Sequence, residues 1–173
     1  KSVGLVATSQ VQHASPAGFS AHTPFRDRYT LIAEQQVYGD IDVVFGGGLQ
    51  YLLPKALGGV RTDDKNLVNV LKDKGFPLLK TRDELLAFKG RKAWGLFAPE
   101  ALLYDFDRKD FSPQEPSLAE MTGKAIETLS KNEKGFFLFV EASKVDWAAH
   151  ANDPVGVVSD LLAYDEAVRV ALD

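Results

Sequence analysis

The chain contains 173 residues, of which 45% are hydrophobic and 25% are charged, as is usual for a globular domain with a buried core. The net charge of −4 excludes a broad basic surface, so nucleic acid is not expected as a specific partner. The absence of cysteine excludes disulfides and thiolate metal sites, and no stretch of the sequence suggests a membrane segment.

Hydrophobic patterns and helix-capping signals predict an alternation of strands and helices along the chain. In chain order they are a strand at 3–8, a helix starting at Ser15-Pro16, a helix at 29–37, a strand at 42–45, a helix at 66–74, a strand at 76–79, a helix at 81–90, a strand at 92–97, a helix at 117–129, a strand at 136–140 and a helix at 159–173.

Several local signals support these elements. Ser15 is predicted to be a helix N-cap followed by proline in the first turn. Thr81 and Ser117 each precede a glutamate by three residues, which is the spacing of a capping box. Gly46 to Gly48 is interpreted as a tight turn after a strand. Residues 101–116 are predicted to be a loop, because Asp, Pro and aromatic residues dominate them.

The strand predicted at 136–140 is apolar throughout, which is typical of a strand covered on both faces. Strands that alternate with helices indicate an α/β fold with a mainly parallel central sheet flanked by helices. Functional sites in such sheets lie beyond the carboxyl ends of the strands. Polar residues that directly follow a strand are therefore the first candidates for chemistry.

One cluster of candidates follows the strand at 136–140. Glu141 comes at the end of the strand, and Asp146 and His150 are four residues apart, so a helix would place them on one face. Two carboxylates and an imidazole can hold Zn²⁺ or Mg²⁺. The spacing is common, however, and taken alone it favours a helix with an N-terminal Asp and a solvated His.

A second cluster follows the strand at 3–8. His13 precedes the predicted helix, Ser15 offers a hydroxyl to a metal or to the helix N-terminus, and Arg26 offers a planar guanidinium that matches two phosphate oxygens. A surface ion pair between Arg26 and Asp27 is the simpler interpretation of that arginine. Together the two clusters suggest phosphoryl transfer, in which metals and arginine stabilise charge on the transferred group.

The two ends of the sequence resemble breaks within a longer chain. The chain starts at Lys1, and no signal peptide precedes the first strand. Residues 159–173 have a helical pattern with no Gly or Pro to end it. We therefore expect residues 1–173 to be a single partial domain from the centre of a longer protein.

Two long motifs resemble bacterial alkaline phosphatases. Residues 140–154, VEASKVDWAAHANDP, are similar to a metal-binding segment of that family, and residues 13–18, HASPAG, are similar to a second family segment that is followed by an arginine at the position of Arg26. Residues 42–48 and 116–129 also resemble the family. The resemblance spans nearly the whole chain in the family's order and implies part of the alkaline-phosphatase-like fold.

The resemblance implies roles by position. Glu141 and Ser15 match ligands of a magnesium site, and Asp146 and His150 match two of the three ligands of one zinc site. Arg26 matches the arginine that binds the phosphoryl oxygens of the substrate.

Two further positions depart from other members of the family. His13 stands where some members have an Asp that acts on magnesium through water. Trp147 stands where other members have a basic or His residue that touches phosphate. The resemblance therefore places both residues next to the metal ligands.

The implied activity is hydrolysis of phosphomonoesters to release inorganic phosphate, through a phosphoserine intermediate and with two zinc ions and one magnesium ion. The family's serine lies in an Asp-Ser-Ala segment, which this sequence lacks. It also lacks the N-terminal nucleophile segment as a whole and the C-terminal segment that supplies the remaining metal ligands. We therefore expect the isolated chain to be inactive.

Two alternatives remain open from the sequence. The chain could come from another metal-dependent member of the superfamily, such as a phosphomutase, sulfatase or phosphodiesterase, or it could be a non-catalytic α/β binding module. The resemblance further implies a periplasmic or extracellular location and a homodimeric parent enzyme.

Overall fold

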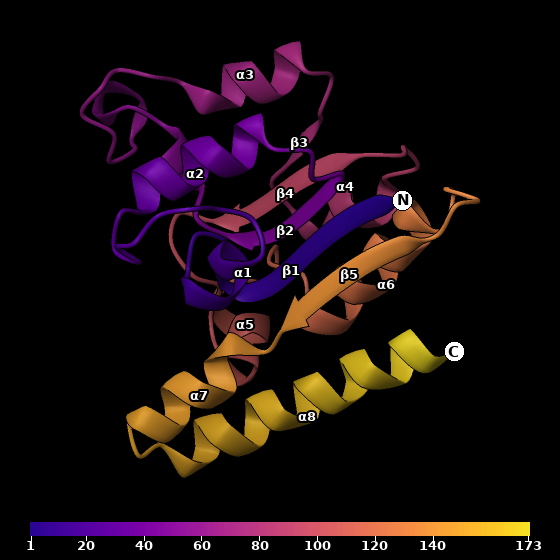
Figure 1. Ribbon diagram of the computed structural model, residues 1–173. Coiled ribbons are helices and arrows are strands. Elements are labelled where there is room, and N and C mark those ends of the chain that lie inside the picture. The colour runs from indigo at the N-terminus through magenta and orange to yellow at the C-terminus, as the bar shows by residue number, and fades with distance from the viewer.

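A five-stranded, all-parallel sheet forms the centre of the molecule, which a computed structural model describes over residues 1–173 (Figure 1). The spatial order of the strands is β3-β4-β2-β1-β5. The strands are β1 (Ser2–Gln10), β2 (Val43–Gly47), β3 (Leu78–Leu79), β4 (Ala93–Ala98) and β5 (Phe136–Glu141). This arrangement confirms the predicted α/β fold with a parallel sheet.

Eight α-helices and two short 3₁₀ helices connect the strands. They are α1 (Ala14–Gly18), α2 (Tyr29–Tyr38), η1 (Leu49–Leu52), η2 (Lys55–Leu57), α3 (Leu67–Asp73), α4 (Arg82–Ala87), α5 (Asp105–Phe111), α6 (Leu118–Leu129), α7 (Ser143–His150) and α8 (Pro154–Leu172). None of these helices combines the length and the apolar character needed to cross a membrane.

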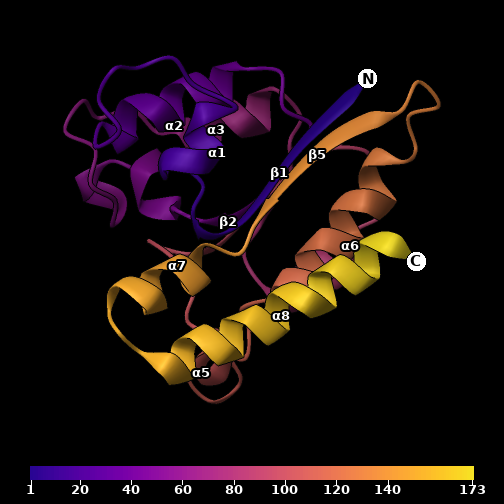
Figure 2. The ribbon, with the colours of Figure 1, turned by 60° about the horizontal axis from the view of Figure 1, so that its bottom comes forward.

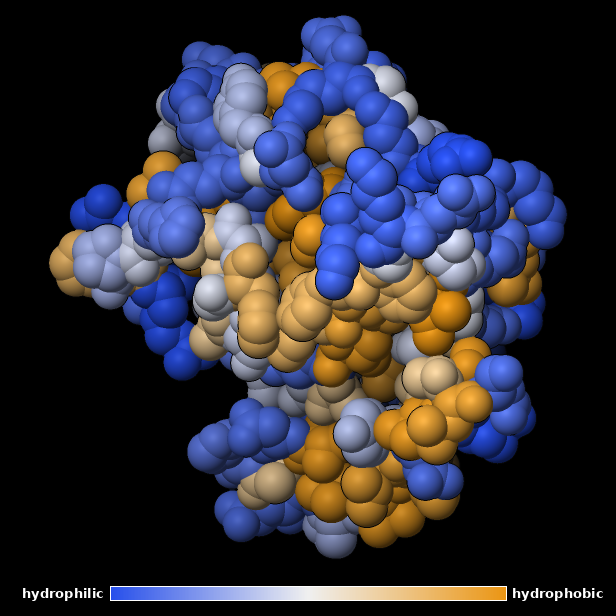
Figure 3. All heavy atoms as spheres, turned by 45° about the vertical axis from the view of Figure 1, so that its right-hand side comes forward, coloured by the Kyte–Doolittle hydropathy of each residue, from blue (hydrophilic) through white to orange (hydrophobic).

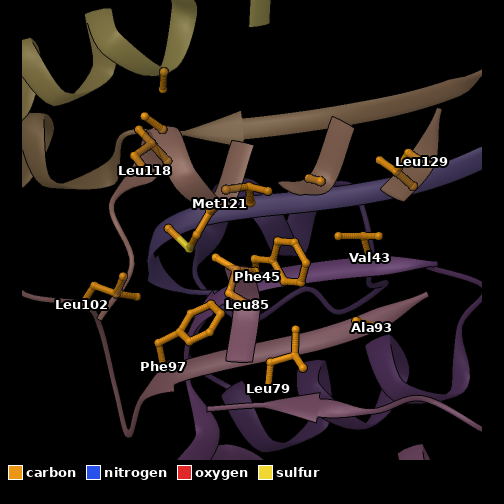
Figure 4. Packing of buried hydrophobic residues seen from close by; sticks show 14 residues of the cluster. Val43, Phe45, Leu79, Leu85, Ala93, Phe97, Leu102, Leu118, Met121 and Leu129 are labelled. Atoms are coloured by element: carbon orange, nitrogen blue, oxygen red, sulfur yellow. The ribbon is translucent and has the colours of Figure 1, made fainter. Parts of the chain in front are cut away.

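Helices cover both faces of the sheet (Figure 2). α2 and α3 lie on one face and α4 and α6 on the other, while α8 packs against α6 and α7. Residues of β2 alternate between the two cores: Val43 and Phe45 belong to the core under α6, and Val44 belongs to the core under α2. Figure 4 shows Phe45 in the same buried cluster as Met121 of α6.

Both predicted capping boxes are present. The Thr81 hydroxyl accepts a hydrogen bond from the Glu84 amide at 3.2 Å, and the Ser117 hydroxyl accepts one from the Glu120 amide at 3.2 Å. These bonds satisfy amide groups that would lack a partner in the first turn of each helix. They start α4 and α6, which carry much of one core.

The predicted glycine turn after β2 is only partly correct. Gly46 and Gly47 lie inside β2, and only Gly48 has a left-handed conformation, with φ of 104°. A Cβ on Gly46 would lie 2.7 Å from the Ala7 carbonyl oxygen, and one on Gly47 would lie 1.8 Å from the Glu100 carbonyl oxygen. The first two glycines therefore permit close backbone packing, and the third makes the turn.

Three helix predictions need correction. The N-cap of α1 is His13 rather than Ser15, because the extended backbone at His13 turns helical at the next residue. Helix α5 forms within the predicted loop at 101–116, where Arg108 pairs with Asp105 at 2.8 Å. Helix α8 begins five residues earlier than predicted, because Asp153 caps it and Pro154 occupies the first turn.

The prediction that the strand at 136–140 is covered on both faces is wrong for this chain. β5 lies at the edge of the sheet, and Phe136 and Phe137 are 38% and 49% exposed. The rest of the strand is covered in part: Leu138 and Val140 pack against the core under α6, and the Phe19 ring lies with its centroid 4.6 Å from that of Phe139. Figure 3 shows an apolar surface that extends over β5 and α8.

Candidate metal and phosphate site

The two predicted clusters lie next to each other because their strands are neighbours. β1 and β5 pair in parallel, with Ala7 opposite Glu141, and their carboxyl ends lead directly into the α1 and α7 regions (Figure 1). α1 contacts both strands. The polar residues after the two strands therefore share one edge of the sheet, as expected for an α/β site.

Hydroxyl groups fix the start of α7 to the end of β1. The Ser143 hydroxyl donates to the Ser9 hydroxyl at 2.9 Å and accepts from the Ser9 amide at 3.2 Å. The Lys144 amide donates to the Thr8 hydroxyl at 3.3 Å. These bonds are buried, so they hold the first turn of α7 against the neighbouring strand.

Asp146 and His150 come together on one face of α7, as predicted from their spacing. The Oδ1 atom of Asp146 lies 3.5 Å from Nε2 of His150. The two side chains are 71% and 82% exposed, so both are open to a ligand arriving from solvent or from another segment. An adjacent carboxylate and imidazole provide two of the ligand types that Zn²⁺ uses.

Glu141 is the last residue of β5, and one of its oxygens stands out chemically. Its Oε2 atom is buried and has no hydrogen-bond partner. A buried carboxylate oxygen without a donor is costly, because desolvation of its charge is not compensated. A cation bound at this oxygen would provide the compensation, so the observation fits the predicted role of Glu141 as a metal ligand.

Arg26, His13 and Trp147 are brought together from three segments. Nη2 of Arg26 lies 3.2 Å from Nε2 of His13, and the His13 ring meets the edge of the Trp147 indole with centroids 5.2 Å apart. Burial, followed by the positive charge of Arg26, lowers the pKa of His13, while Glu141 and Asp146 act in the opposite direction. Arg26 makes no ion pair with Asp27, so the simpler interpretation of this arginine is wrong.

Ser15 is exposed in α1, and its hydroxyl makes no hydrogen bond within the chain. The side chain is therefore free to bind a ligand, but it forms no hydrogen bond with Glu141, its predicted partner in the magnesium site. No group of three or more His, Asp or Glu residues converges on a single point anywhere in the chain. Among the predicted metal ligands, Asp146 and His150 thus form a pair, and no complete coordination shell is present.

A large surface cavity lies elsewhere. It has a volume of about 1150 Å³ and opens between α5, α6 and α8, with Phe106, Val158 and Leu162 among its lining residues. None of the predicted site residues lines it. Its apolar and charged walls come from all three helices, whereas the candidate site residues lie near α1 and α7.

Comparison with known proteins identifies the family of the chain. The family model described as alkaline phosphatase matches residues 1–173. The chain belongs to the alkaline phosphatase family. Alkaline phosphatase 4 of Bacillus subtilis is 39% identical over 179 residues, which cover 100% of this chain and 36% of the relative. The tissue-nonspecific alkaline phosphatase of Rattus norvegicus is 32% identical and is covered to 39%.

Solved alkaline phosphatases share the fold. The Thermus thermophilus enzyme matches 99% of this chain with a TM-score of 0.92 and 36% identity, and the match covers 35% of that enzyme. A histidine-to-glutamate variant of the alkaline phosphatase TAB5, described with magnesium in a site named M3, matches with a TM-score of 0.82 and 32% identity. The chain thus spans about a third to a half of the alkaline phosphatases it matches.

Sequence reasoning missed two contacts near the site of this alkaline phosphatase family member. The Arg26–His13 contact joins residues that are thirteen positions apart, and no periodic pattern predicts it. Lys144 lies over the Trp147 ring at 4.3 Å. Their separation of three residues on one helix was the available signal for this second contact.

Proposed function

We propose that the full-length protein hydrolyses phosphomonoesters through a phosphoserine intermediate, using two zinc ions and one magnesium ion, and that residues 1–173 carry part of its active site. The observation that carries this proposal is the buried, unpartnered Oε2 of Glu141 beside the Arg26–His13 pair, at the carboxyl ends of two neighbouring strands. A cation site next to a phosphate-binding arginine is what this chemistry requires.

Arg26 binds the phosphoryl group in this proposal. Its guanidinium can donate two parallel hydrogen bonds to two phosphoryl oxygens. The hydrogen bond to His13 at 3.2 Å restricts the orientation of the guanidinium before substrate arrives. The lowered pKa of His13 favours the neutral ring, which can accept this hydrogen bond at Nε2.

The metal ligands divide into two pairs. Glu141 and Ser15 would hold magnesium, and Asp146 and His150 would hold one zinc ion, while His13 and Trp147 lie beside these positions. When bound, such metals stabilise the negative charge that develops on phosphoryl and hydroxyl oxygens.

The site is divided between this chain and the rest of the protein. The Asp146–His150 pair supplies two of the three protein ligands that a catalytic zinc site uses, and the sequence has no Asp-Ser-Ala nucleophile segment. The relatives are between two and three times longer than the region they share with this chain. We therefore infer that residues 1–173 are an inactive single partial domain. From the family resemblance we propose that the full-length protein is a homodimer located in the periplasm or outside the cell.

Zinc binding provides the first test. A chromogenic chelator would compete with purified residues 1–173 for Zn²⁺, and the weak binding expected from two ligands should fall at least about tenfold in Asp146→Asn. His22→Gln is the matched control, because His22 is exposed and lies outside the site. Equal zinc affinity of the chain and Asp146→Asn would contradict the proposed ligand pair.

Hydrolysis of an aryl phosphate at alkaline pH, with Zn²⁺ and Mg²⁺ supplied, provides the second test. The folded chain alone should show no turnover. The full-length protein should be active and should lose about 100-fold or more in kcat/KM on Arg26→Ala. Turnover by the isolated chain that disappears in Asp146→Asn would overturn the divided site and would require a nucleophile within residues 1–173.

A further inference from the structure

Lys144 is a buried lysine that the proposed function leaves without a role. It lies in the first turn of α7 and is only 7% exposed, yet it forms no ion pair. Its Nζ atom lies between two aromatic rings, 4.3 Å from the Trp147 centroid and 4.7 Å from the Tyr104 centroid. Cation–π attraction strengthens when water is excluded, so these two rings compensate for part of the burial, together with the negative charges of Asp160, Glu115 and Glu100.

The contacts of Trp147 extend this arrangement toward the phosphate-binding arginine. The indole lies over Lys144 and also meets the His13 ring, and His13 in turn contacts Arg26. Four side chains from three separate segments thus form a continuous row that ends at the Arg26 guanidinium. Lys144 is the buried end of this row, and Arg26 is the exposed end.

The two ends of the row differ in how firmly they are held. The backbone of Lys144 is bound to Thr8, and its side chain is enclosed between two rings. The side chain of Arg26 forms a hydrogen bond only with His13, and it forms no ion pair with a carboxylate. The order of the exposed arginine therefore depends on groups that are fixed deeper in the structure.

We propose that Lys144 is a positioning residue, which holds the Trp147 indole in the orientation that supports His13 and, through His13, the Arg26 guanidinium. The positioning of Trp147 and His13 rests on geometry alone, whereas its consequence for phosphate rests on the proposed function of Arg26. A neutral side chain of similar length would fill the same space but would not attract the ring faces. Arginine would retain both the charge and the stacking.

Fluorescence tests the positioning directly, because the chain has only two tryptophans and Trp94 is buried in β4. In Lys144→Met, acrylamide quenching of Trp147 should rise about twofold or more and its anisotropy should fall. Lys144→Arg should restore both values. Lys134→Met, which removes an exposed lysine far from the row, is the matched control.

Histidine NMR resonances provide a second readout that does not depend on tryptophan. The chain has three histidines, and Lys144→Met should shift the ring signals of His13 while those of His22 stay unchanged. Unchanged quenching, anisotropy and His13 signals in a folded Lys144→Met variant would overturn the proposal. If Lys144→Met fails to fold, Lys144→Gln replaces it with the same expected changes, and unchanged quenching and His13 signals in folded Lys144→Gln would overturn the proposal.

Inorganic phosphate separates this inference from the proposed function. If Arg26 binds phosphate, the affinity of the full-length protein for phosphate should fall about three- to tenfold in Lys144→Met and recover in Lys144→Arg. Phosphate affinity that stays intact in both Lys144→Met and Arg26→Ala, while Trp147 and His13 move in Lys144→Met, would refute the role of Arg26 and retain the positioning of Trp147 and His13. Intact affinity in Lys144→Met with lost affinity in Arg26→Ala would refute the step from His13 to Arg26. Unchanged signals together with lost affinity would refute the positioning.

Discussion

Asp160 makes the stability of the fold depend on pH. The residue lies on α8, is 4% exposed and accepts a hydrogen bond from the Asp105 amide at 3.2 Å. Burial raises the pKa of Asp160 from 3.8 to about 6, and the negative charge of Asp105 adds to this effect, while the hydrogen bond from the Asp105 amide and the charges of Lys144 and Arg108 reduce it. The carboxyl group is thus held in a place that favours its neutral form.

The direction of the effect follows from proton linkage. The pKa is higher in the folded state than in the unfolded state, so between about pH 4 and pH 6 the folded state holds more protons. The free energy of unfolding must therefore fall as pH rises through this window. The full shift corresponds to at most about 3 kcal/mol. Screening by water and the neighbouring cations reduces the expected contribution to roughly 1–2 kcal/mol.

Asp160→Asn should remove this pH dependence while keeping an oxygen for the Asp105 amide. Urea unfolding followed by circular dichroism between pH 5 and pH 7.5 would measure this dependence. Over that range, the free energy of unfolding of the variant should rise by roughly 1 kcal/mol relative to that of the original chain. Asp165→Asn, an exposed substitution on the same helix, is the matched control. Parallel stability profiles for the original chain and Asp160→Asn would refute the reasoning.

Two further substitutions test the packing of the sheet, with thermal unfolding as the measurement. Gly47→Ala should destabilise by several kcal/mol, because its Cβ would lie 1.8 Å from the Glu100 carbonyl oxygen, whereas Gly18→Ala meets no atom within 4 Å and should be tolerated. Met121→Ala should cost about 2–5 kcal/mol, because Met121 is fully buried under the sheet, and Leu86→Ala on the exposed side of α4 should cost much less. Equal losses within either pair would contradict these packing assignments.

Local signals in the sequence predicted most of the secondary structure. The capping boxes at Ser117 and Thr81 depend on residues three apart, so their partners are within reach before the chain folds. The helix α5 was missed because its stabilising ion pair, Arg108 to Asp105, lies in a segment dominated by turn-forming residues. The edge position of β5 was missed because composition reports how apolar a strand is but not whether a neighbour covers it.

The candidate site also combines features that the local sequence determines with features that depend on the tertiary structure. The sequence by itself determined the helix face shared by Asp146 and His150, since a spacing of four residues suffices. It also determined that Glu141 ends a strand. Only the tertiary structure decided that His13 lies between Arg26 and Trp147, because β1 and β5 are far apart in the chain and become neighbours through sheet pairing. Contacts of this kind depend on strand order, which local pattern does not specify.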